Sequence, residues 1–383
     1  MNIGIFETEH FEGAYPVIKL FDKPENKLVL FTDKKTYKRF SDLFGPQTQN
    51  YEWVIENTAA NRFSFFFSIY HAVREHRLDI LYINTISKNH LLFGLMIKFL
   101  PPIRVVITIH DINCLFESRF TMGIRDFIRH IGIKVLLQEV NEFNVVSDTM
   151  ISYLREKSNR IKIHNVPGAI FEHRVNKTSI KGFINLVVPG SIDNKRRDYD
   201  TVFDLLIAAE LIELNLHITL LGGPYELYGA SVIDRAKKWK GRYTRLFYYE
   251  EKIVEQNEFD KKLDSSHFIF IPSVIRTSIC GDIPEIYGIT KSSGNIFDVI
   301  KHAKPFIVPK ELLIPVNLNN SCIAYRSLSE VVEILKTLAE FPDHYTDWTD
   351  RAITNSMNYT IEKIRDNNPS LFTNIKETPQ NLV

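Results

Sequence analysis

The chain has 383 residues, of which 44% are apolar and 24% are charged, and its 47 basic residues nearly balance 46 acidic ones. This length favours two domains, each large enough to bury a core without disulfide or metal staples. A net charge of +1 argues against the broad basic surface of duplex-binding proteins, so we expect no nucleic-acid partner. Any anion site must be local.

The start of the chain lacks the pattern of a secretory signal. Met1 leads directly into the strand-like run Asn2–Phe6, with no basic segment before an apolar one. The longest apolar runs, such as Leu91–Leu100, are too short to span a bilayer. We expect a cytoplasmic protein, and leave open a loose peripheral contact with the inner membrane face.

Short β-rich runs alternate with helical patterns along the first half of the chain. This alternation predicts βαβ units and a parallel sheet. Arg104–Ile109 is the clearest strand, because it is continuously apolar and β-branched after its first residue. The predicted strands are Asn2–Phe6, Lys27–Phe31, Tyr51–Ile55, Asp79–Ile83, Arg104–Ile109 and Phe143–Val146, with helices over Arg62–His76 and Arg119–Leu137.

The alternation stops at residues 167–182, where Pro167, Gly168 and Gly182 occur without a clear period, and we predict a linker there. A second series of the same kind follows. Its predicted strands are Phe183–Val188, Asn215–Leu221, Arg245–Tyr248, His267–Ile271, Pro305–Val308 and Cys322–Tyr325. Its predicted helices are Thr201–Glu213, Ser231–Lys238, Glu258–Leu263, Gly294–His302 and Leu328–Phe341.

The sequence thus predicts an α/β protein with two Rossmann-like domains that face each other across a cleft. The first domain covers residues 1–166 and the second residues 183–342. A helix over 343–366 is expected to cross back to the first domain, and 367–383 form a polar, frayed tail. Ligands of such folds bind at the carboxyl ends of the parallel strands, beside helix N-termini.

Two glycine turns of the second domain follow predicted strands. Gly190 ends the first strand, and the cations Lys195, Arg196 and Arg197 come just before the next helix. Cations beside exposed helix N–H groups suit a diphosphate, although a solvated basic loop is an equal alternative. Gly222 and Gly223 end the next strand, where they allow a ligand close to the backbone or simply form a tight turn.

Two further segments of the second domain carry polar groups. Glu285 follows the strand ending at Ile271 and a polar loop, so its carboxylate either accepts hydrogen bonds from sugar hydroxyls or is an exposed structural group. The run Ser292-Ser293-Gly294-Asn295 precedes an apolar-periodic helix, which is an N-cap signature whose free N–H groups suit a phosphate. Asp298 lies about one turn into that helix.

The first domain has its polar candidates at two strand ends. His110 and Asp111 directly follow the best buried strand, so they belong at the carboxyl edge of the sheet. Gly13 begins the first helix, where an early turn can face a phosphate, and Glu7, Glu9 and His10 crowd the same loop. In the second domain, Asp198-Tyr199-Asp200 matches a short metal pattern, but Asp200 is interpreted as a residue of a helix N-terminus.

Taken in order, these segments resemble a GT-B glycosyltransferase, nearest to the retaining glycosyltransferase family 4. Pro189-Gly190-Ser191 and Arg197-Asp198-Tyr199-Asp200 stand where the family has Gly-Arg and Lys-Gly-x-Asp, with Ser191 in place of the arginine. Leu221-Gly222-Gly223 resembles the next glycine turn, and Glu285-Ile286-Tyr287-Gly288 the family's Glu-x-x-Gly. His110-Asp111 resembles the pair that contacts the donor sugar.

The resemblance departs from the family in the spacing of its two acids. The stretch between Glu285 and Pro305 is longer than the family's. Counting back from Pro305 places Asp298 at the second acid, which binds the nucleotide ribose in the family, whereas counting forward from Glu285 places Ser293 there. Both assignments stay open.

The resemblance implies a glycosyltransferase that moves a sugar from a nucleotide-sugar donor to a glycan or lipid-linked acceptor, with retention, in polysaccharide or glycoconjugate synthesis. No metal or other cofactor is expected, because cations and a helix dipole can stabilise the leaving diphosphate. We expect catalytic roles for His110, Glu285 and Arg196. The expected substrate-binding residues are Gly13, Asp111, Gly190, Lys195, Arg197, Gly222, Gly223, Ser292, Ser293, Gly294, Asn295 and Asp298.

Three alternatives stay open. Inversion would need a general base, for which Asp111, Glu9 and His10 are candidates. A nucleotide-sugar epimerase would use the same fold. A non-catalytic GT-B-like protein that binds nucleotide sugars would explain Ser191 and the altered spacing of the acids.

Overall fold

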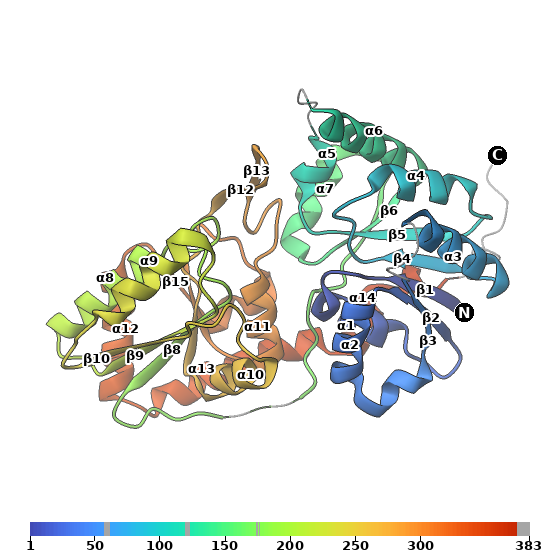
Figure 1. The fold of residues 1–383 in the computed structure, drawn as a ribbon. Helices are drawn as coiled ribbons and strands as arrows, with labels where there is room; N and C mark the ends of the chain where they lie inside the picture. The colour runs from blue at the N-terminus through green and yellow to red at the C-terminus, as the bar shows by residue number, and fades with distance from the viewer. Residues whose placement is uncertain (57–61, 119–122, 174, 176, 374–383) are drawn as a thin grey trace. The chain divides into compact units, whose positions relative to one another are not determined.

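The computed structural model describes residues 1–56, 62–118, 123–173, 175 and 177–373. The chain divides into two units (Figure 1). Unit 1 comprises Met1–Ala169 together with Ile361–Val383, and unit 2 comprises Ile170–Thr360. Each unit contains one parallel sheet with helices, which confirms the predicted α/β class.

The sheet of unit 1 has seven strands in the order β3-β2-β1-β4-β5-β6-β7, each parallel to its neighbours. Its strands are β1 (Asn2–Phe6), β2 (Lys27–Thr32), β3 (Glu52–Ile55), β4 (Ile80–Ile83), β5 (Arg104–Ile109), β6 (Glu142–Val145) and β7 (Lys162–His164). The strand order reverses between β1 and β4. The carboxyl ends of these two strands therefore flank the position where α/β sheets bind their ligands.

The helices of unit 1 form two layers. Helices α1 (Phe11–Phe21), α2 (Lys34–Phe44) and α14 (Ile361–Asn367) pack together, as do α3 (Arg62–Glu75), α4 (His90–Phe99) and α6 (Ile124–Glu139) (Figure 1). The shorter α5 (Ile112–Phe116) and α7 (Ile151–Lys157) follow β5 and β6. Helix α6 was predicted to begin at residue 119, but residues 119–122 lie outside the described part of the chain.

The main sheet of unit 2 has six parallel strands in the order β10-β9-β8-β11-β14-β15. They are β8 (Ile184–Pro189), β9 (Leu216–Leu221), β10 (Thr244–Tyr248), β11 (Phe268–Phe270), β14 (Phe306–Pro309) and β15 (Cys322–Tyr325). The helices are α8 (Tyr199–Leu211), α9 (Glu226–Lys237), α10 (Gln256–Ser265), α11 (Gly294–His302), α12 (Leu328–Glu340) and α13 (His344–Ser356). Here the order reverses between β8 and β11.

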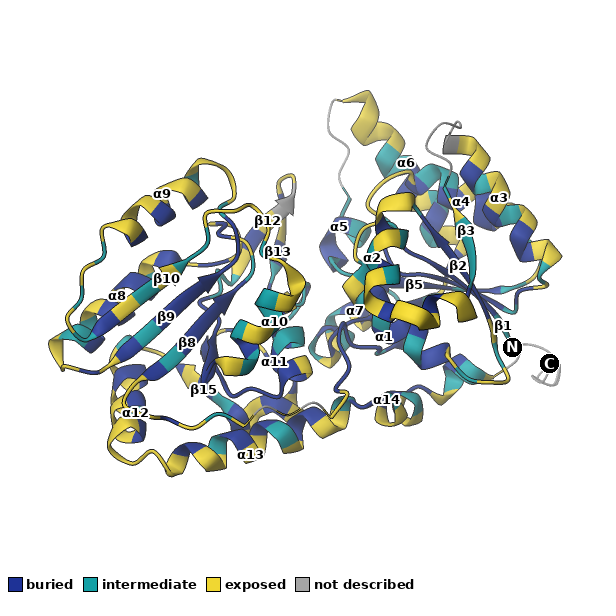
Figure 2. Ribbon diagram, turned by 60° about the horizontal axis from the view of Figure 1, so that its bottom comes forward, coloured by how far each residue is buried: buried dark blue, intermediate teal, exposed yellow. Residues whose placement is uncertain are grey.

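Apolar residues of the central strands form the core of unit 2. Val188, Leu220 and Phe270 are fully buried in β8, β9 and β11, and Figure 2 draws β8 and β9 largely in dark blue. Strands that are buried on both faces read as continuous apolar runs, which is why the sequence located these elements. The core therefore holds the carboxyl ends of β8, β9 and β11 in fixed register.

The structure adds an element that the sequence analysis missed. Residues 276–286, interpreted as part of a polar loop, form an antiparallel hairpin of β12 (Arg276–Cys280) and β13 (Ile283–Ile286). Gly281-Asp282 at its tip is a two-residue turn signal that could have revealed it. Pro284 within β13 obscured that signal, since proline is unusual inside strands.

The C-terminal region also differs from the single helix predicted for residues 343–366. Helix α13 belongs to unit 2, α14 belongs to unit 1, and a 3₁₀ turn (Met357–Tyr359) separates them. Part of the predicted frayed tail is packed, because Leu371 is fully buried and its carbonyl accepts a hydrogen bond from Arg104. Residues 374–383 lie outside the described part. Among the described residues, no helix has both the length and the apolar character of a membrane span.

Candidate functional site

Four segments of unit 2 converge at the carboxyl edge of its sheet, where the strand order reverses. The turn after β8 is tied to the turn after β9 by a hydrogen bond from Ile192 N to Gly223 O of 2.9 Å. It is tied to the segment after β11 by a bond from Asp198 N to Pro272 O of 2.8 Å. The first turn of α11 is the fourth segment. This is the edge at which the sequence predicted a ligand site.

Arg197 lies at the centre of this cluster. Its side chain is only 8% exposed, and its Nη1 donates to Ser191 O at 3.0 Å while Nη2 donates to Asn295 Oδ1 at 2.9 Å. Its buried Nε makes no hydrogen bond to any described residue. A buried N–H without a partner is rare and costs free energy, so this donor needs an acceptor that the described residues do not supply.

The N-terminus of α11 is joined to Arg197 through Asn295. The Asn295 amide donates to Pro189 O at 2.9 Å and to Asp298 Oδ2 at 3.3 Å. Ser293 is the N-cap residue, but its side chain makes no capping hydrogen bond. The first turn of α11 therefore keeps backbone donors and the positive end of the helix dipole beside a buried guanidinium. Ser292 and Gly294 flank this N-cap.

Different physical constraints act at the glycine positions of this edge. Gly190 has a φ of +93°, and a Cβ there would lie 2.3 Å from Arg197 Nη2. A Cβ on Gly222 would lie 2.2 Å from Gly190 O, and one on Gly223 would lie 2.3 Å from Glu251 O. These two glycines allow close backbone packing, which is sufficient to explain them without a ligand. A Cβ on Gly294, in contrast, would meet nothing within 4 Å.

The structure separates the three adjacent cations. Lys195 and Arg196 are exposed, and Arg196 Nε lies 3.3 Å from Asp193 Oδ2, whereas Arg197 is buried. The acids of the short metal pattern belong to the helix start, as the sequence analysis proposed for Asp200. Asp198 caps α8 by accepting from Asp200 N at 3.0 Å, and Asp200 pairs with Arg235. No group of residues that could hold a metal ion is found among the described residues.

Glu285 does not lie at the exposed loop edge where the sequence placed it. It is fully buried in β13, where its backbone partner is Thr277 of β12. Gly288 of the same motif has a φ of +85°, and a Cβ there would lie 2.3 Å from Leu313 O. The glycine of Glu-x-x-Gly is therefore required by the turn itself, and the alternative of an exposed structural Glu is excluded.

The carboxyl edge of unit 1 carries a polar cluster of another kind. Glu7, directly after β1, is 1% exposed and accepts hydrogen bonds from the backbone N–H groups of Glu9 at 2.5 Å and His10 at 2.8 Å. Its second oxygen accepts from Asn84 Nδ2 and Thr85 Oγ1, both at 2.7 Å. From the sequence, Glu7 was only one of several polar residues in the loop after the first strand. That polar residues directly follow both β1 and β4 is the signal that could have found it.

His110 adjoins this cluster at the end of β5. Its Nε2 lies 3.0 Å from Asn84 O and 3.3 Å from Thr85 Oγ1. Burial of the ring, followed by the charge of His10, lowers the pKa of His110 below its usual value. The imidazole is therefore neutral at pH 7. Asp111 is half-buried and is the N-cap residue of α5.

Gly13 lies in the first turn of α1, near the same edge. A Cβ at this position would be 3.7 Å from Asn84 Nδ2, which is an ordinary contact. Its backbone conformation therefore does not require glycine.

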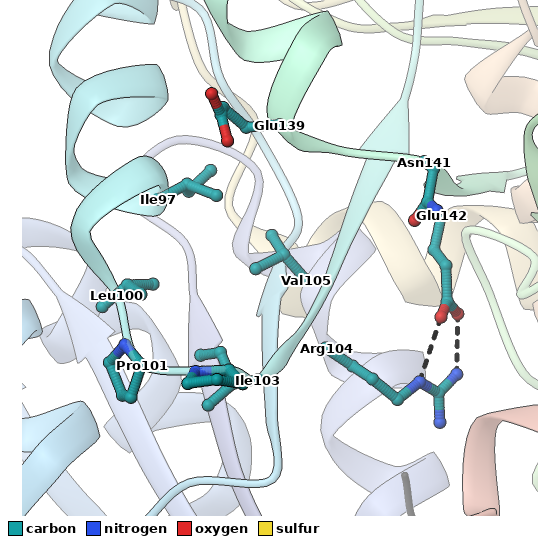
Figure 3. Close-up of a pocket in the computed structure, with 10 residues that line it drawn as sticks. Ile97, Leu100, Pro101, Ile103, Arg104, Val105, Glu139, Asn141 and Glu142 are labelled. Atoms are coloured by element: carbon teal, nitrogen blue, oxygen red, sulfur yellow. Dashed lines mark hydrogen bonds and ion pairs between the residues drawn. The ribbon is translucent and has the colours of Figure 1, made fainter. Parts of the chain in front are cut away.

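A pocket of unit 1 lies away from these residues. It has a volume of about 280 Å³ and is lined by Arg104 and Glu142, the first residues of β5 and β6, together with the end of α4 (Figure 3). The Arg104 guanidinium is bound in parallel to both Glu142 oxygens, at 3.1 and 2.7 Å. This pocket is at the amino edge of the sheet, opposite Glu7 and His110.

Comparison with solved structures identifies the fold. Staphylococcus aureus TarM, in complex with UDP, superposes with a TM-score of 0.62 at 10% identity, covering 97% of this chain and 99% of that one. Sucrose-phosphate synthase from Thermosynechococcus elongatus gives 0.59 at 13% identity, covering 97% and 98%. The chain has the GT-B fold.

The same fold is shared with an enzyme of another kind. UDP-GlcNAc 2-epimerase from Neisseria meningitidis, bound to UDP-GlcNAc, superposes with a TM-score of 0.54 at 10% identity, covering 96% of this chain and 100% of that one. No family model and no curated protein matches the sequence.

Proposed function

We propose that this chain is a nucleotide-sugar-dependent glycosyltransferase that transfers a sugar, with retention, to a glycan or lipid-linked acceptor in polysaccharide or glycoconjugate synthesis. The observation that carries the proposal is the buried Arg197 guanidinium. It keeps an N–H that has no partner among the described residues, and it is joined by Asn295 to the N-cap of α11, where Ser293 makes no side-chain capping bond. A guanidinium beside a helix N-terminus is a strong combination for binding a phosphate.

In this proposal, unit 2 binds the diphosphate of the donor. The leaving diphosphate gains negative charge in the transition state, and preorganised donors aimed at it lower the barrier. Arg197 and the first turn of α11 supply buried donors, while Lys195 and Arg196 supply exposed cations from the same loop. These cations and the helix dipole act without a metal ion. Asp298, or Ser293 in the other alignment, contacts the ribose.

The remaining roles follow from the resemblance to glycosyltransferase family 4. Glu285 orients the donor sugar, and His110 contacts it as a neutral imidazole. An inverting reaction would instead use a general base, and Asp111, Glu9 and His10 are its candidates. The stereochemistry of the product, read by NMR of the new anomeric centre, separates the two courses.

The proposal is tested by thermal unfolding with UDP-, GDP-, ADP-, CMP- and dTDP-sugars. A ligand that binds only the native state adds about 2.7 kcal/mol of stability at a hundredfold excess over its dissociation constant. We expect a rise in Tm with one nucleotide class, largely lost in Arg197→Lys, which keeps the charge but loses the planar fork. Arg196→Ala is expected to weaken the rise, and the exposed Arg351→Ala, on α13, is the matched control. No rise with any nucleotide sugar would contradict the proposal.

A second candidate is favoured by the structural similarity to UDP-GlcNAc 2-epimerase. An epimerase would convert its donor when no acceptor is present, whereas a transferase would not. Incubation of the bound nucleotide sugar alone, followed by NMR, separates these activities. Binding without turnover, in the presence of candidate acceptors, would instead indicate a non-catalytic nucleotide-sugar-binding protein.

The proposal includes a loose contact with an anionic membrane surface. Three neighbouring helices of unit 1 each expose a pair of large apolar side chains one turn apart: Phe63 and Phe67 on α3, Leu95 and Phe99 on α4, and Ile124 and Ile128 on α6. Lys98 and Arg125 are exposed beside them. Apolar side chains flanked by cations suit a lipid interface.

Sedimentation with vesicles of anionic and of zwitterionic lipid tests this contact. We expect binding to anionic vesicles, and expect it to fall at least about threefold when Phe67 and Phe99 are both changed to Ser, a loss that follows from their exposed apolar area. Equal binding to both vesicle types, or to neither, would contradict it.

A further inference from the structure

Glu7 is a buried carboxylate whose surroundings consist of donors. Two backbone N–H groups bind Oε1, and the Asn84 amide and the Thr85 hydroxyl bind Oε2. A carboxylate that accepts this many hydrogen bonds is held in one position, and it holds its donors in turn. Glu7 therefore joins the loop after β1 to the end of β4.

The Thr85 hydroxyl has a single hydrogen, which it donates in a hydrogen bond to Glu7. A hydroxyl has one donor and two acceptor positions. Because the hydrogen is directed to Glu7 Oε2 at 2.7 Å, Thr85 can only accept from the His110 ring, whose Nε2 lies 3.3 Å away. The other neighbour of Nε2 is the Asn84 carbonyl at 3.0 Å, which is also an acceptor only. Both partners of Nε2 thus require a proton on that nitrogen.

We propose that Glu7 is a positioning residue that, together with the Asn84 carbonyl, holds His110 in the Nε2–H tautomer, so that Nδ1 is the nitrogen offered to a ligand as a hydrogen-bond acceptor. Among the described residues, His110 Nδ1 has no hydrogen-bond partner. In a neutral imidazole, the hydrogen-bond partners of one ring nitrogen determine which of the two nitrogens carries the proton. A sugar hydroxyl that donates to Nδ1 would match this arrangement.

The charges around His110 agree with a neutral ring. Burial and the neighbouring His10, whose ring centroid is 5.5 Å away, lower the pKa of His110, while the Asn84 carbonyl, Glu7 and Asp111 act in the opposite direction. A neutral imidazole has one donor and one acceptor nitrogen, so the choice of tautomer decides what it can bind. Glu7 acts on that choice through Thr85, in addition to the Asn84 carbonyl, and is not itself hydrogen-bonded to His110.

The tautomer is measured by two-bond ¹H–¹⁵N NMR of the protein labelled with ¹⁵N-histidine, with His110→Asn for assignment among the 12 histidines. We expect the Nε2–H form in the wild type. In Glu7→Gln, the amide oxygen is expected to stay with the fixed backbone N–H groups and the amide nitrogen to face Thr85, whose hydrogen is then released toward His110. The population of the Nδ1–H tautomer should rise about fivefold, because losing one ordinary hydrogen bond changes an equilibrium constant by about that factor.

Two further variants keep the experiment decisive. Thr85→Val removes only the hydroxyl and should change the tautomer ratio in the same direction, even if Glu7→Gln does not fold. Glu142→Gln is the matched control, because Glu142 is also a largely buried carboxylate of this sheet but binds Arg104 and His164 at the opposite edge. It should alter the His164 signal and leave His110 unchanged. A wild-type Nδ1–H form, or unchanged His110 signals in folded Glu7→Gln and Thr85→Val, would overturn the proposal.

The role of Nδ1 toward a ligand rests on the proposed function and needs a second measurement. With UDP-glucose as the probe, Glu7→Gln should weaken binding about fivefold in the wild-type background. It should have no further effect in His110→Asn, because Glu7 acts through His110. An equal loss in both backgrounds would indicate a merely structural role. If the wild type binds no nucleotide sugar, the proposed function fails, but the NMR result still decides the tautomer.

Discussion

The two units share one topology but carry opposite chemistry at the point where their strand order reverses. In unit 1, a carboxylate after β1 is surrounded by donors, and each of its oxygens accepts two hydrogen bonds. In unit 2, a guanidinium after β8 is held by two acceptors and keeps a buried N–H for which the described part of the chain provides no acceptor. The carboxylate of the first cluster is saturated with hydrogen bonds, whereas the guanidinium of the second is not.

This difference separates a positioning role from a binding role. A saturated buried group contributes stability and fixes its neighbours, whereas an unsaturated donor gains free energy only when a ligand supplies the missing acceptor. The comparison therefore predicts that variants in unit 1 change folding and geometry, and that variants in unit 2 also change anion binding.

The largest effect is expected from Glu7→Leu. Removing the carboxylate leaves four donors without their acceptor in a buried place, which should cost on the order of 4 kcal/mol. Urea unfolding followed by hydrogen exchange would locate the loss in unit 1. The exposed Glu25→Leu is the control, with a change of at most about 0.5 kcal/mol. If Glu7→Leu lowered the free energy of unfolding by less than about 1 kcal/mol, the Glu7 cluster would not have the stabilising role assigned to it.

Arg197→Met should cost on the order of 3 kcal/mol, because Ser191 O and Asn295 Oδ1 lose their donors. The same change should abolish the rise in Tm with the bound nucleotide sugar, measured by calorimetry. Arg196→Met, on an exposed side chain, should change stability by less than about 1 kcal/mol. Full ligand binding in Arg197→Met would show that the buried guanidinium is not the anion site.

The distinction among the three adjacent cations could not be made from the sequence. The apolar runs located β8 and the Ser-Ser-Gly-Asn signature located α11, because both are local patterns. That Arg197 rather than Arg196 is buried depends on Asn295, which lies far along the chain. Glu7 was missed for a similar reason, since only the β1–β4 pairing brings Asn84 and Thr85 to it. Patterns of neighbouring residues were therefore sufficient to predict the fold. The site could not be predicted in the same way, because it depends on contacts between residues that lie far apart in the sequence.

The opposite edge of unit 1 should respond to pH. Burial alone would raise the pKa of Glu142, but hydrogen bonds from His164 and Arg104 outweigh it and hold the pKa near 2. Because the folded value is depressed, Glu142 stabilises unit 1 above about pH 5, and this stability is lost as the pH falls toward 2. We expect a contribution of roughly 2–3 kcal/mol at pH 7. Urea midpoints of wild type and Glu142→Gln should converge at acid pH, and a constant difference would contradict the assignment.

The smallest effects concern the glycines of unit 2. Gly190→Ala should cost about 1–2 kcal/mol, because its positive φ and the nearby Arg197 oppose a Cβ. Gly294→Ala, with open space around the new methyl group, should change stability by at most about 0.5 kcal/mol. Thermal unfolding measures both, and an equal loss in the two variants would show that Gly190 is not specifically constrained.

The most direct test of the contrast between the two units is hydrogen exchange with inorganic pyrophosphate, a diphosphate without base or sugar. We expect pyrophosphate to slow hydrogen exchange in residues 190–197 and 293–298 of unit 2. Exchange in residues 7–13 and 84–85 of unit 1 should not change, and the protection in unit 2 should be lost in Arg197→Lys. Protection confined to unit 1, or protection in unit 2 that survives Arg197→Lys, would contradict this expectation.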